Sequence, residues 1–249
     1  MMNPAEFGTL RRSESDLWWF RGMRQILFDL LDPVASSRRP ARVLEAGCGT
    51  GYVAGLLAER YGWIMFPADL SADGLSIARS RGLSRLCQID IAHCPFRSES
   101  FDAVLSLDVL VHFPAGEEAA ALAEFNRVLT PGGMLVLRVS ALNLLRSRHS
   151  EFTHERQRFT RGRLERLARG HGFRVLRCTY ANSLLLPVAI ARFRLWEPLL
   201  RKPPASGTEP VSPWLDRLLY KPLAIEAAML RRGFNFPAGQ SLILLGEKL

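Results

Sequence analysis

Three glycines stand at alternate positions in the segment VLEAGCGTG, where an apolar run changes into a helical pattern. Gly47, Gly49 and Gly51 have no Cβ atom, so the backbone there can adopt positive φ and a ligand can approach the main chain closely. Glu45, a carboxylate, lies two residues before the first glycine. Tyr52 stands where the dinucleotide pattern G-x-G-x-x-G has its third glycine. The segment predicts a nucleotide-binding turn, although many folds use such a turn only for close packing.

Two further acids follow at the ends of the next two predicted strands. Asp69 lies in FPADLS, and its carboxylate can accept hydrogen bonds from both hydroxyls of a ribose. Asp90 lies in QIDIAHCPF, where it can accept a hydrogen bond from the exocyclic amine of adenine while the backbone N–H of Ile91 reaches a ring nitrogen. Each acid alone could be a residue of a surface loop. Together with Glu45 they outline a site for an adenosine with an additional polar group.

In this order the motifs resemble those of the class I S-adenosylmethionine-dependent methyltransferases, over residues 40–140. VLEAGCGTG, ADLS, IDIAHCPF and FDAVLSLDVLVHF are similar to the first four motifs of the family, and RVLTPGGMLVLRV to the helix and strand that follow. WWFRGMR and SRHSEFTHERQRFT resemble a bacterial branch whose acceptors are mostly unassigned, often small metabolites or glycan and lipid intermediates. Val111 departs from the pattern, because many relatives have a glutamate before the histidine.

The resemblance implies a cofactor, S-adenosylmethionine, that leaves as S-adenosylhomocysteine, and it implies no metal. Glu45 and the glycine turn would hold the methionine portion, Asp69 the ribose, and Asp90 with Ile91 the adenine. The residues expected to bind the cofactor are Glu45, Gly47, Cys48, Gly49, Gly51, Asp69, Leu70, Asp90, Ile91, Leu107, Asp108, Trp19 and Arg24.

Histidines are the candidate general bases. Methyl transfer from a sulfonium depends mainly on alignment, and a hydroxyl or amine nucleophile must also lose a proton, which histidine can take near neutral pH. We expect His154 to be the base because Glu151 and Glu155 lie close in sequence and either could raise its basicity. His149 is the second candidate, and His112, just past the fourth strand, is the third. A structural hydrogen bond is the alternative role for each.

The elements that must position these residues alternate between short runs of Val, Ile and Leu and segments of helical pattern. This alternation predicts an α/β fold with a Rossmann-like, doubly wound, seven-stranded and mostly parallel sheet. A helix is expected over residues 13–32, ended by Pro33, and an apolar helix over 183–200 that is broken or kinked at Pro187. QSLILLGEKL is expected to close the sheet after a helical insertion.

One methyltransferase domain is expected over residues 1–249. Its parts are an N-terminal helical lid (1–39), a cofactor-binding core (40–140), an acceptor-side segment with a strand (141–182), a helical cap (183–236) and a closing strand (237–249). The aromatic segment WWF of the lid either packs the helix on the sheet or closes over the cofactor. The cap has the same two interpretations, as core packing or as a wall that admits an apolar acceptor.

Positive charge is concentrated in one region of the chain. The formal net charge is +9, and residues 141–202 alone contain thirteen Arg and one Lys against four Glu, a local charge of +10. Such a region could contact phosphate, an anionic membrane surface or nucleic acid, or it could be a solvated arginine-rich face. We expect at most peripheral membrane contact through the basic and apolar cap.

Several sequence features restrict the acceptor and the compartment. The fourth strand ends in SLDVL rather than in an Asn-Pro-Pro-Tyr type segment, and Cys94 precedes a proline instead of following one. These features disfavour nucleic acid and favour a small-molecule or lipid-linked acceptor.

The four cysteines form no CxxC pair, no signal pattern precedes the first helix, and no run reaches about 18 apolar residues. The expected location is therefore the cytoplasm, and the oligomeric state is open.

The sequence thus predicts a methyltransferase that moves a methyl group to an oxygen or nitrogen nucleophile of a small-molecule, glycan or lipid-linked acceptor in a biosynthetic pathway. Two alternatives remain open. Val111 in place of an acid suggests a catalytically inactive scaffold or regulatory partner that binds S-adenosylmethionine. The glycine turn and Asp69 would also suit an NAD-dependent oxidoreductase.

Overall fold

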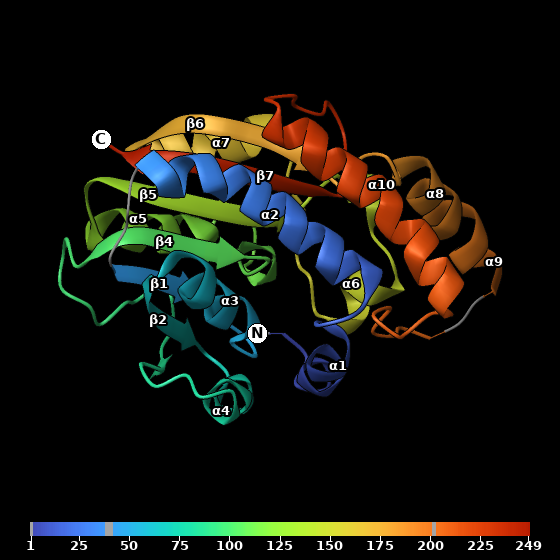
Figure 1. Cartoon of the computed structure of the whole chain (residues 1–249), viewed down its shortest axis with the longest axis horizontal. Coiled ribbons are helices and arrows are strands. Elements are labelled where there is room, and N and C mark those ends of the chain that lie inside the picture. Colours follow the sequence, from blue (N-terminus) through green and yellow to red (C-terminus); the bar gives the residue numbers. More distant parts are fainter. Residues whose placement is uncertain (1, 38–41, 201–202) are drawn as a thin grey trace.

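A seven-stranded sheet forms the centre of the computed structural model, which describes residues 2–37, 42–200 and 203–249. The strand order is β3-β2-β1-β4-β5-β7-β6, and all pairs are parallel except those of β7 with β5 and β6 (Figure 1). The predicted fold class is confirmed, including the closing strand. The strands are β1 (Arg42–Ala46), β2 (Ile64–Asp69), β3 (Cys87–Gln88), β4 (Phe101–Leu107), β5 (Leu129–Ser140), β6 (Phe173–Ala181) and β7 (Ser241–Lys248).

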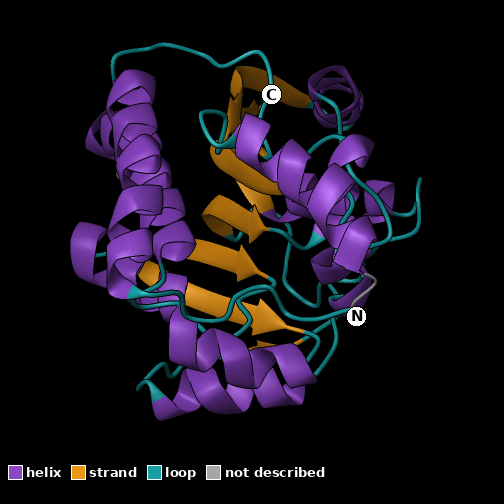
Figure 2. Cartoon of the chain, turned by 90° about the vertical axis from the view of Figure 1, so that its right-hand side faces the viewer, coloured by secondary structure: helices purple, strands orange, loops and turns teal. Residues whose placement is uncertain are grey.

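Helices lie on both sides of this sheet (Figure 2). In Figure 1, α2 and α10 cross in front of it, and α5 and α7 lie behind it. The helices are α1 (Ala5–Ser13), α2 (Trp18–Ser37), α3 (Tyr52–Tyr61), α4 (Ala72–Ser80), α5 (Glu118–Val128), α6 (Arg148–Phe152), α7 (Arg161–Gly170), α8 (Leu186–Ala191), α9 (Glu197–Leu200) and α10 (Pro213–Arg231). Two 3₁₀ turns, η1 (Leu110–His112) and η2 (Asn143–Leu145), and a π-helical segment, η3 (Arg192–Trp196), complete them.

The core explains why the central strands are almost entirely apolar. In β1 and β4, Val43, Leu44, Val104 and Leu105 are fully buried, because helices cover both faces of the sheet. Parallel strands that are buried on both faces expose only their ends, where Glu45 and Asp69 are among the last residues of β1 and β2 and Asp108 follows β4. The carboxyl ends of these strands are therefore the edge at which a ligand can bind.

The N-terminal region differs from the expected single helix over residues 13–32. α1 ends at Ser13, a turn follows, and α2 begins at Trp18 and continues past Pro33 to Ser37. The prediction that Pro33 ends the helix is wrong. Proline removes one backbone hydrogen bond from a helix interior, and the burial of Ala35 in the core beyond it favours continuation.

The segment around Pro187 also differs from its prediction. Pro187 stands in the first turn of α8, where its missing N–H leaves no hydrogen bond unmade, so the helix begins there and is not kinked. After Ala191 the segment continues as the π-helical η3 and then as α9.

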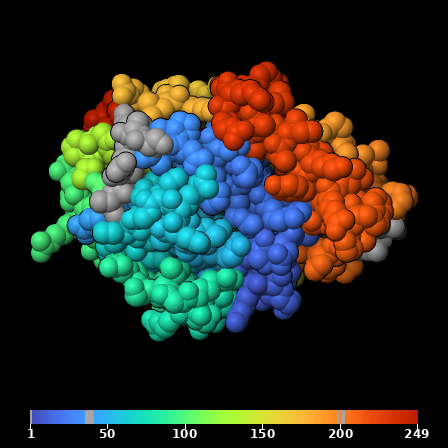
Figure 3. All heavy atoms as spheres, viewed as in Figure 1, coloured from blue at the N-terminus to red at the C-terminus, as the bar shows by residue number. Residues whose placement is uncertain are grey.

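The expected cap region contains two different parts. α10 packs along α2, and a Cβ atom at Gly22 would collide with Leu223, so the missing side chain allows the two helices to cross closely. Figure 3 shows the resulting contact between the blue N-terminal helices and the orange-red α10. α8 and α9 instead stand at the end of the molecule, on the right of Figure 1. None of the described helices is long and apolar enough to cross a membrane.

Candidate active site

A cavity of about 1070 Å³ lies at the carboxyl ends of β1, β2, β4 and β5. Its walls come from α1 and α2, from the loops after these strands, from residues 147–158, from α8 and η3, and from residues 205–211. Eleven of the thirteen residues predicted to bind the cofactor line it, and Gly49 and Gly51 do not. Their individual contacts with a cofactor stay predictions.

The glycine turn after β1 has the conformation that its sequence requires. Gly47, Gly49 and Gly51 have φ values of +88°, +53° and +71°. A Cβ atom at Gly47 would collide with the side chain of Val109, and Gly51 occupies the position just before α3. Gly47 and Cys48 line the cavity, whereas the other two glycines shape the turn.

Glu45 is a buried carboxylate that faces the cavity. Its residue is 2% exposed, and its Oε2 atom has no hydrogen-bond partner among the described residues. Burial, together with the nearby charge of Asp69, raises the pKa of Glu45 to about 8. A buried acceptor without a partner is costly, so a ligand that donates to it would be bound strongly. The methionine amino group of S-adenosylmethionine fits this requirement.

Asp69 ends β2 as predicted, whereas Asp90 lies two residues beyond β3, which is shorter than expected and ends at Gln88. Both acids line the cavity with Leu70 and Ile91. The Oδ2 and Oδ1 atoms of Asp69 accept hydrogen bonds from the backbone N–H groups of Gly49 and Ser71, both at 2.8 Å. These bonds hold the carboxylate in place while its remaining lone pairs stay available. The arrangement suits an acceptor for ribose hydroxyls.

An ion pair on the fourth-strand side was not predicted from the sequence. Asp108 has a φ of +60°, and its Oδ2 atom lies 2.6 Å from Nη2 of Arg138 in β5. The Arg138 guanidinium stands over the ring of Trp19, 5.5 Å from its centre. All three residues line the cavity. Arg138 occupies an ordinary inward position of a strand, and no motif distinguishes it.

Arg24, predicted to contact the cofactor, also stabilises the lid. It donates to the backbone carbonyls of Glu14 and Ser15 in the turn between α1 and α2. The buried carboxylate of Glu14 in turn accepts from Thr50 Oγ1 at 2.6 Å and pairs with Arg81. The turn between α1 and α2 is therefore tied to the glycine turn, and sequence reasoning missed Glu14.

A second contact joins the lid to the opposite wall. Glu6 of α1 is buried, and its Oε1 atom accepts hydrogen bonds from Ser206 at 3.0 Å and Thr208 at 3.2 Å. On the α10 side, Asp216 accepts from the backbone N–H of Trp18 at 2.7 Å. These bonds hold α1 and the start of α2 against segments about 200 residues away in the chain.

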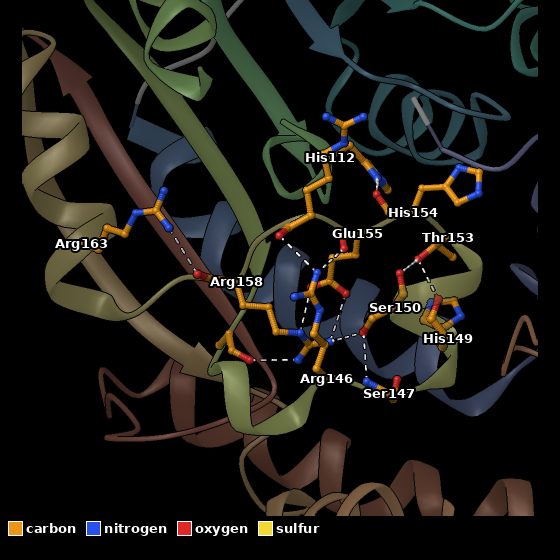
Figure 4. A network of polar contacts seen from close by, with 12 residues as sticks. His112, Arg146, Ser147, His149, Ser150, Thr153, His154, Glu155, Arg158 and Arg163 are labelled. Carbon is orange, nitrogen blue, oxygen red and sulfur yellow. Dashed lines mark hydrogen bonds and ion pairs between the residues drawn. The ribbon is translucent and has the colours of Figure 1, made fainter. Parts of the chain in front are cut away.

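His112 and His149 line the cavity, and His154 does not (Figure 4). The Nδ1 atom of His112 lies 3.4 Å from the backbone carbonyl of His154. Because a carbonyl can only accept, this contact places the proton of a neutral His112 on Nδ1 and leaves Nε2 as an acceptor. Burial lowers the pKa of His112 and that of His149, so both are neutral at neutral pH.

His154 has an exposed side chain and a φ of +59°. Glu155, expected to raise its basicity, is buried and pairs with Arg158 at 2.8 Å (Figure 4). Glu151 is exposed. Although its backbone carbonyl contacts His112, His154 does not line the cavity, and its role as the base stays a prediction that the geometry disfavours.

The arginines of residues 146–163 are mostly engaged within the protein. Arg158 donates to the carbonyl of Ala141 at 3.0 Å and to Ser150 Oγ at 2.9 Å, in addition to its pair with Glu155. Arg146 donates to the carbonyl of Glu155 at 2.7 Å (Figure 4). Much of the positive charge in this region thus builds the acceptor-side wall.

The strand order and the cavity at the carboxyl edge of the sheet agree with the fold of the class I S-adenosylmethionine-dependent methyltransferases. Residues 44–137 match the family described as "Methyltransferase domain", so the chain has a methyltransferase domain of this class, with S-adenosylmethionine as its cofactor. A group of His, Cys, Asp and Glu that could hold a metal does not occur among the described residues.

Similar proteins agree on the methyltransferase domain, and the name of one of them states tRNA as its acceptor. "Methyltransferase GfsG" of Streptomyces halstedii is 33% identical over 122 residues, which cover 46% of this chain and 42% of that protein. "Probable tRNA methyltransferase 9B" of Bos taurus is 30% identical, covering 55% of this chain and 30% of that one. A SAM-dependent methyltransferase structure from Archaeoglobus fulgidus has a TM-score of 0.60 at 15% identity and covers 96% of this chain and 99% of that one. The chain spans less than half the length of these two curated relatives, and the expectation against nucleic acid finds no support in their names.

Proposed function

We propose that the protein transfers the methyl group of S-adenosylmethionine to an oxygen or nitrogen nucleophile of a small molecule, or of the small end group of a glycan or lipid-linked acceptor. The observation that supports this proposal is the wall opposite the cofactor edge. There α8 and residues 205–211 line the cavity, and the bonds of Glu6 to Ser206 and Thr208 join this wall to α1. A folded nucleic acid would have to displace these contacts, whereas a small group would not.

The cofactor edge is the part of the site that would hold the donor. Glu45 would accept from the methionine amino group, Asp69 would accept from the ribose hydroxyls, and Asp90 would bind the adenine. When bound, S-adenosylmethionine supplies a methyl group that a sulfonium has already activated. The contribution of the chain is then to align the acceptor, to exclude water and to accept a proton.

His112 is the residue that best fits the role of proton acceptor. Its Nδ1–H faces the His154 carbonyl, so Nε2 has a free lone pair, and burial keeps the ring neutral by lowering its pKa. A base must be unprotonated before it can act, and this tautomer satisfies that condition. His149 is the alternative base, because its buried Nδ1 atom has no hydrogen-bond partner among the described residues.

A scaffold without catalysis is the second candidate function, and Val111 is the residue that motivates it. The Val111 side chain is buried, and its carbonyl accepts from the backbone N–H groups of Arg156 at 2.8 Å and Gln157 at 3.2 Å. Val111 therefore joins the fourth-strand loop to the acceptor-side wall. Burial of the side chain favours an apolar residue at this position, so Val111 by itself is not a sign of lost catalysis.

The test uses the purified protein with S-adenosylhomocysteine, NAD and methyl-labelled S-adenosylmethionine. Calorimetry should detect S-adenosylhomocysteine and not NAD. Labelled donor should then transfer its methyl group to compounds in a small-molecule extract and not to a purified tRNA fraction. Label in the tRNA would contradict the small-molecule proposal, donor binding without any transfer would favour the scaffold, and NAD binding alone would favour an oxidoreductase.

A further inference from the structure

The outer faces of α8, η3, α9 and α10 expose large apolar side chains. Of the fourteen exposed large hydrophobic residues among the described part of the chain, eight lie between positions 184 and 225. Seven of these are 53 to 76% exposed, and we call them the cap face: Val188, Leu195, Trp196, Leu199, Trp214, Leu218 and Ile225. A concentration of this kind is unusual on a protein surface and marks a region that contacts a partner.

Packing of the fold does not account for this face. On α10, Trp214, Leu218 and Ile225 follow one another at spacings of four and seven residues, which places them along one stripe of the helix. Leu223 and Leu230 lie in the buried core on the other side. The inner residues hold α10 in place, so the outer stripe is free to serve another contact.

Charges around the cap face are separated by sign. In the described residues of these helices the basic side chains Arg192, Arg194, Arg217 and Lys221 are exposed. The acids are paired or turned inward: Asp216 pairs with Arg21 at 2.6 Å, Glu197 is 12% exposed and lies 3.7 Å from Arg192, and Glu226 is buried. The face therefore presents cations beside apolar groups and attracts a surface of negative charge.

The cap face adjoins the cavity. Val188 and Arg192 belong to the exposed surface and also line the cavity, and Leu215 and Leu219 line it from α10. α8, α9 and the beginning of α10 lie at one end of the molecule in Figure 1. A surface that contacts this end would therefore lie beside the cavity.

We propose that the cap face docks on an anionic lipid bilayer. Exposed tryptophans, leucines that can enter the acyl boundary and flanking arginines are the combination that binds such a surface. A second copy of the chain is a poorer occupant, because two faces that present only cations repel each other. The inference goes beyond the proposed function and does not depend on it.

The direct test is co-sedimentation of the full chain with vesicles of phosphatidylcholine alone or mixed with phosphatidylglycerol. Binding is expected only to the mixed vesicles at about 0.05 M salt, and it should fall steeply at about 0.5 M salt because ions screen the attraction. Equal binding to both kinds of vesicle, or no binding at low salt, would overturn the proposal.

Charge reversals locate the contact. Arg194→Glu combined with Arg217→Glu should weaken binding to the mixed vesicles by about 25-fold or more, since each cation near an anionic surface contributes about fivefold. The matched control is Arg79→Glu combined with Arg97→Glu, two exposed arginines outside the cap. Loss of the same size in both pairs would assign the binding to net charge alone and contradict the proposal.

Two substitutions of exposed leucines test the apolar part of the contact. Leu199 and Leu249 are both 76% exposed, and only the first belongs to the cap face. Leu199→Ser should weaken vesicle binding several-fold, and Leu249→Ser should leave it unchanged. A concentration-dependent dimer that Leu199→Ser abolishes, measured by ultracentrifugation without vesicle binding, would instead assign the face to a second copy. Calorimetry with S-adenosylhomocysteine is independent of these results, so failure of docking and failure of the proposed function can be told apart.

Discussion

The two sides of the cavity are built in different ways. The cofactor side comes from the ends of β1, β2 and β4, which are adjacent parallel strands, so the residues at these ends meet at one edge of the sheet. The acceptor side brings together α1, residues 147–158, α8 and the loop at Ser206. Its contacts join positions as far apart as Glu6 and Thr208.

Two buried carboxylates show what this difference means. Glu45 on the cofactor side has one oxygen that finds no partner in the described part of the chain, whereas Glu155 on the acceptor side is paired with Arg158. The cofactor side thus keeps unsatisfied polar groups for a ligand. The acceptor side pairs most of its charges within the protein and offers a ligand mainly shape, with Glu6 Oε2 and a few histidine nitrogens as polar groups. Specific polar recognition is therefore expected for the donor, and recognition by shape for the acceptor.

The largest effect should come from the turn that defines the cofactor side. Gly47→Val adds a side chain at a φ of +88° and against Val109, so affinity for S-adenosylhomocysteine should fall about 100-fold or more. Gly55→Ala on α3 is the control, since its Cβ atom would meet nothing within 4 Å. Calorimetry measures both variants. Normal binding by Gly47→Val would remove the turn from the donor site.

A change at His112 should affect the rate of methyl transfer without affecting the binding of the donor. His112→Ala should lower turnover by about 10²–10⁴-fold and leave the affinity for S-adenosylhomocysteine unchanged. Burial lowers the pKa of His112 from the ordinary 6.5, and only the neutral ring accepts a proton, so the wild-type rate should fall as pH drops through a value below 6.5. His154→Ala is the control and should keep its rate. Equal losses in both variants would show that neither ring acts alone as the base.

The burial of the Glu45 carboxylate should affect the free energy of unfolding as well as the affinity for S-adenosylhomocysteine. Its folded pKa of about 8 exceeds the ordinary 4.5, so the free energy of unfolding should decrease as pH rises from 4.5 to 8 and then level off. Glu45→Gln removes this loss and should raise the melting temperature at pH 9 by a few degrees. The same variant should bind S-adenosylhomocysteine several-fold more weakly.

Thermal scans from pH 5 to 9 and calorimetry test this trade-off. A parallel loss of stability at every pH would mean that Glu45 is a structural residue rather than one kept for a ligand. Binding of unchanged affinity would likewise contradict its assignment to the methionine amino group.

The smallest effect is expected where the two sides are joined. Glu6→Ala removes the bonds to Ser206 and Thr208, so the lid should open more often and S-adenosylhomocysteine should dissociate a few-fold faster. Arg11→Ala, an exposed change on the same helix, is the control. Stopped-flow displacement measures the rates. Identical rates for wild type and Glu6→Ala would show that this contact does not retain the ligand.

The sheet and the cofactor edge could be predicted from the sequence because both depend on local patterns of residues. Apolar runs alternate with helices, and in a parallel sheet each strand end places its next residue at the same edge. Glu45, Asp69 and Asp90 therefore reach one cavity, as predicted. The positive φ values of the glycines follow from the same short segment.

The acceptor side and the lid could not be predicted in the same way. Arg138 reaches the cavity only because β5 lies beside β4, and Glu14 acts through Thr50 and Arg81, which no spacing relates to it. His154 was preferred for its acidic neighbours in sequence, but a neighbour in sequence can turn to a different partner, as Glu155 does with Arg158.

The position of β7 has a consequence for how the protein is made. β5 and β6 do not pair with each other, and each pairs with β7, which follows both of them in the chain. Until residues 241–248 leave the ribosome, the hydrogen-bonding edges of β5 and β6 stay open and can recruit strands of other nascent chains. A product that stops before this segment lacks the strand that joins the two parts of the sheet. Such a product is expected to aggregate or to be degraded by cellular proteases. Chains that lack residues 241–248 would then be removed before they bind the cofactor.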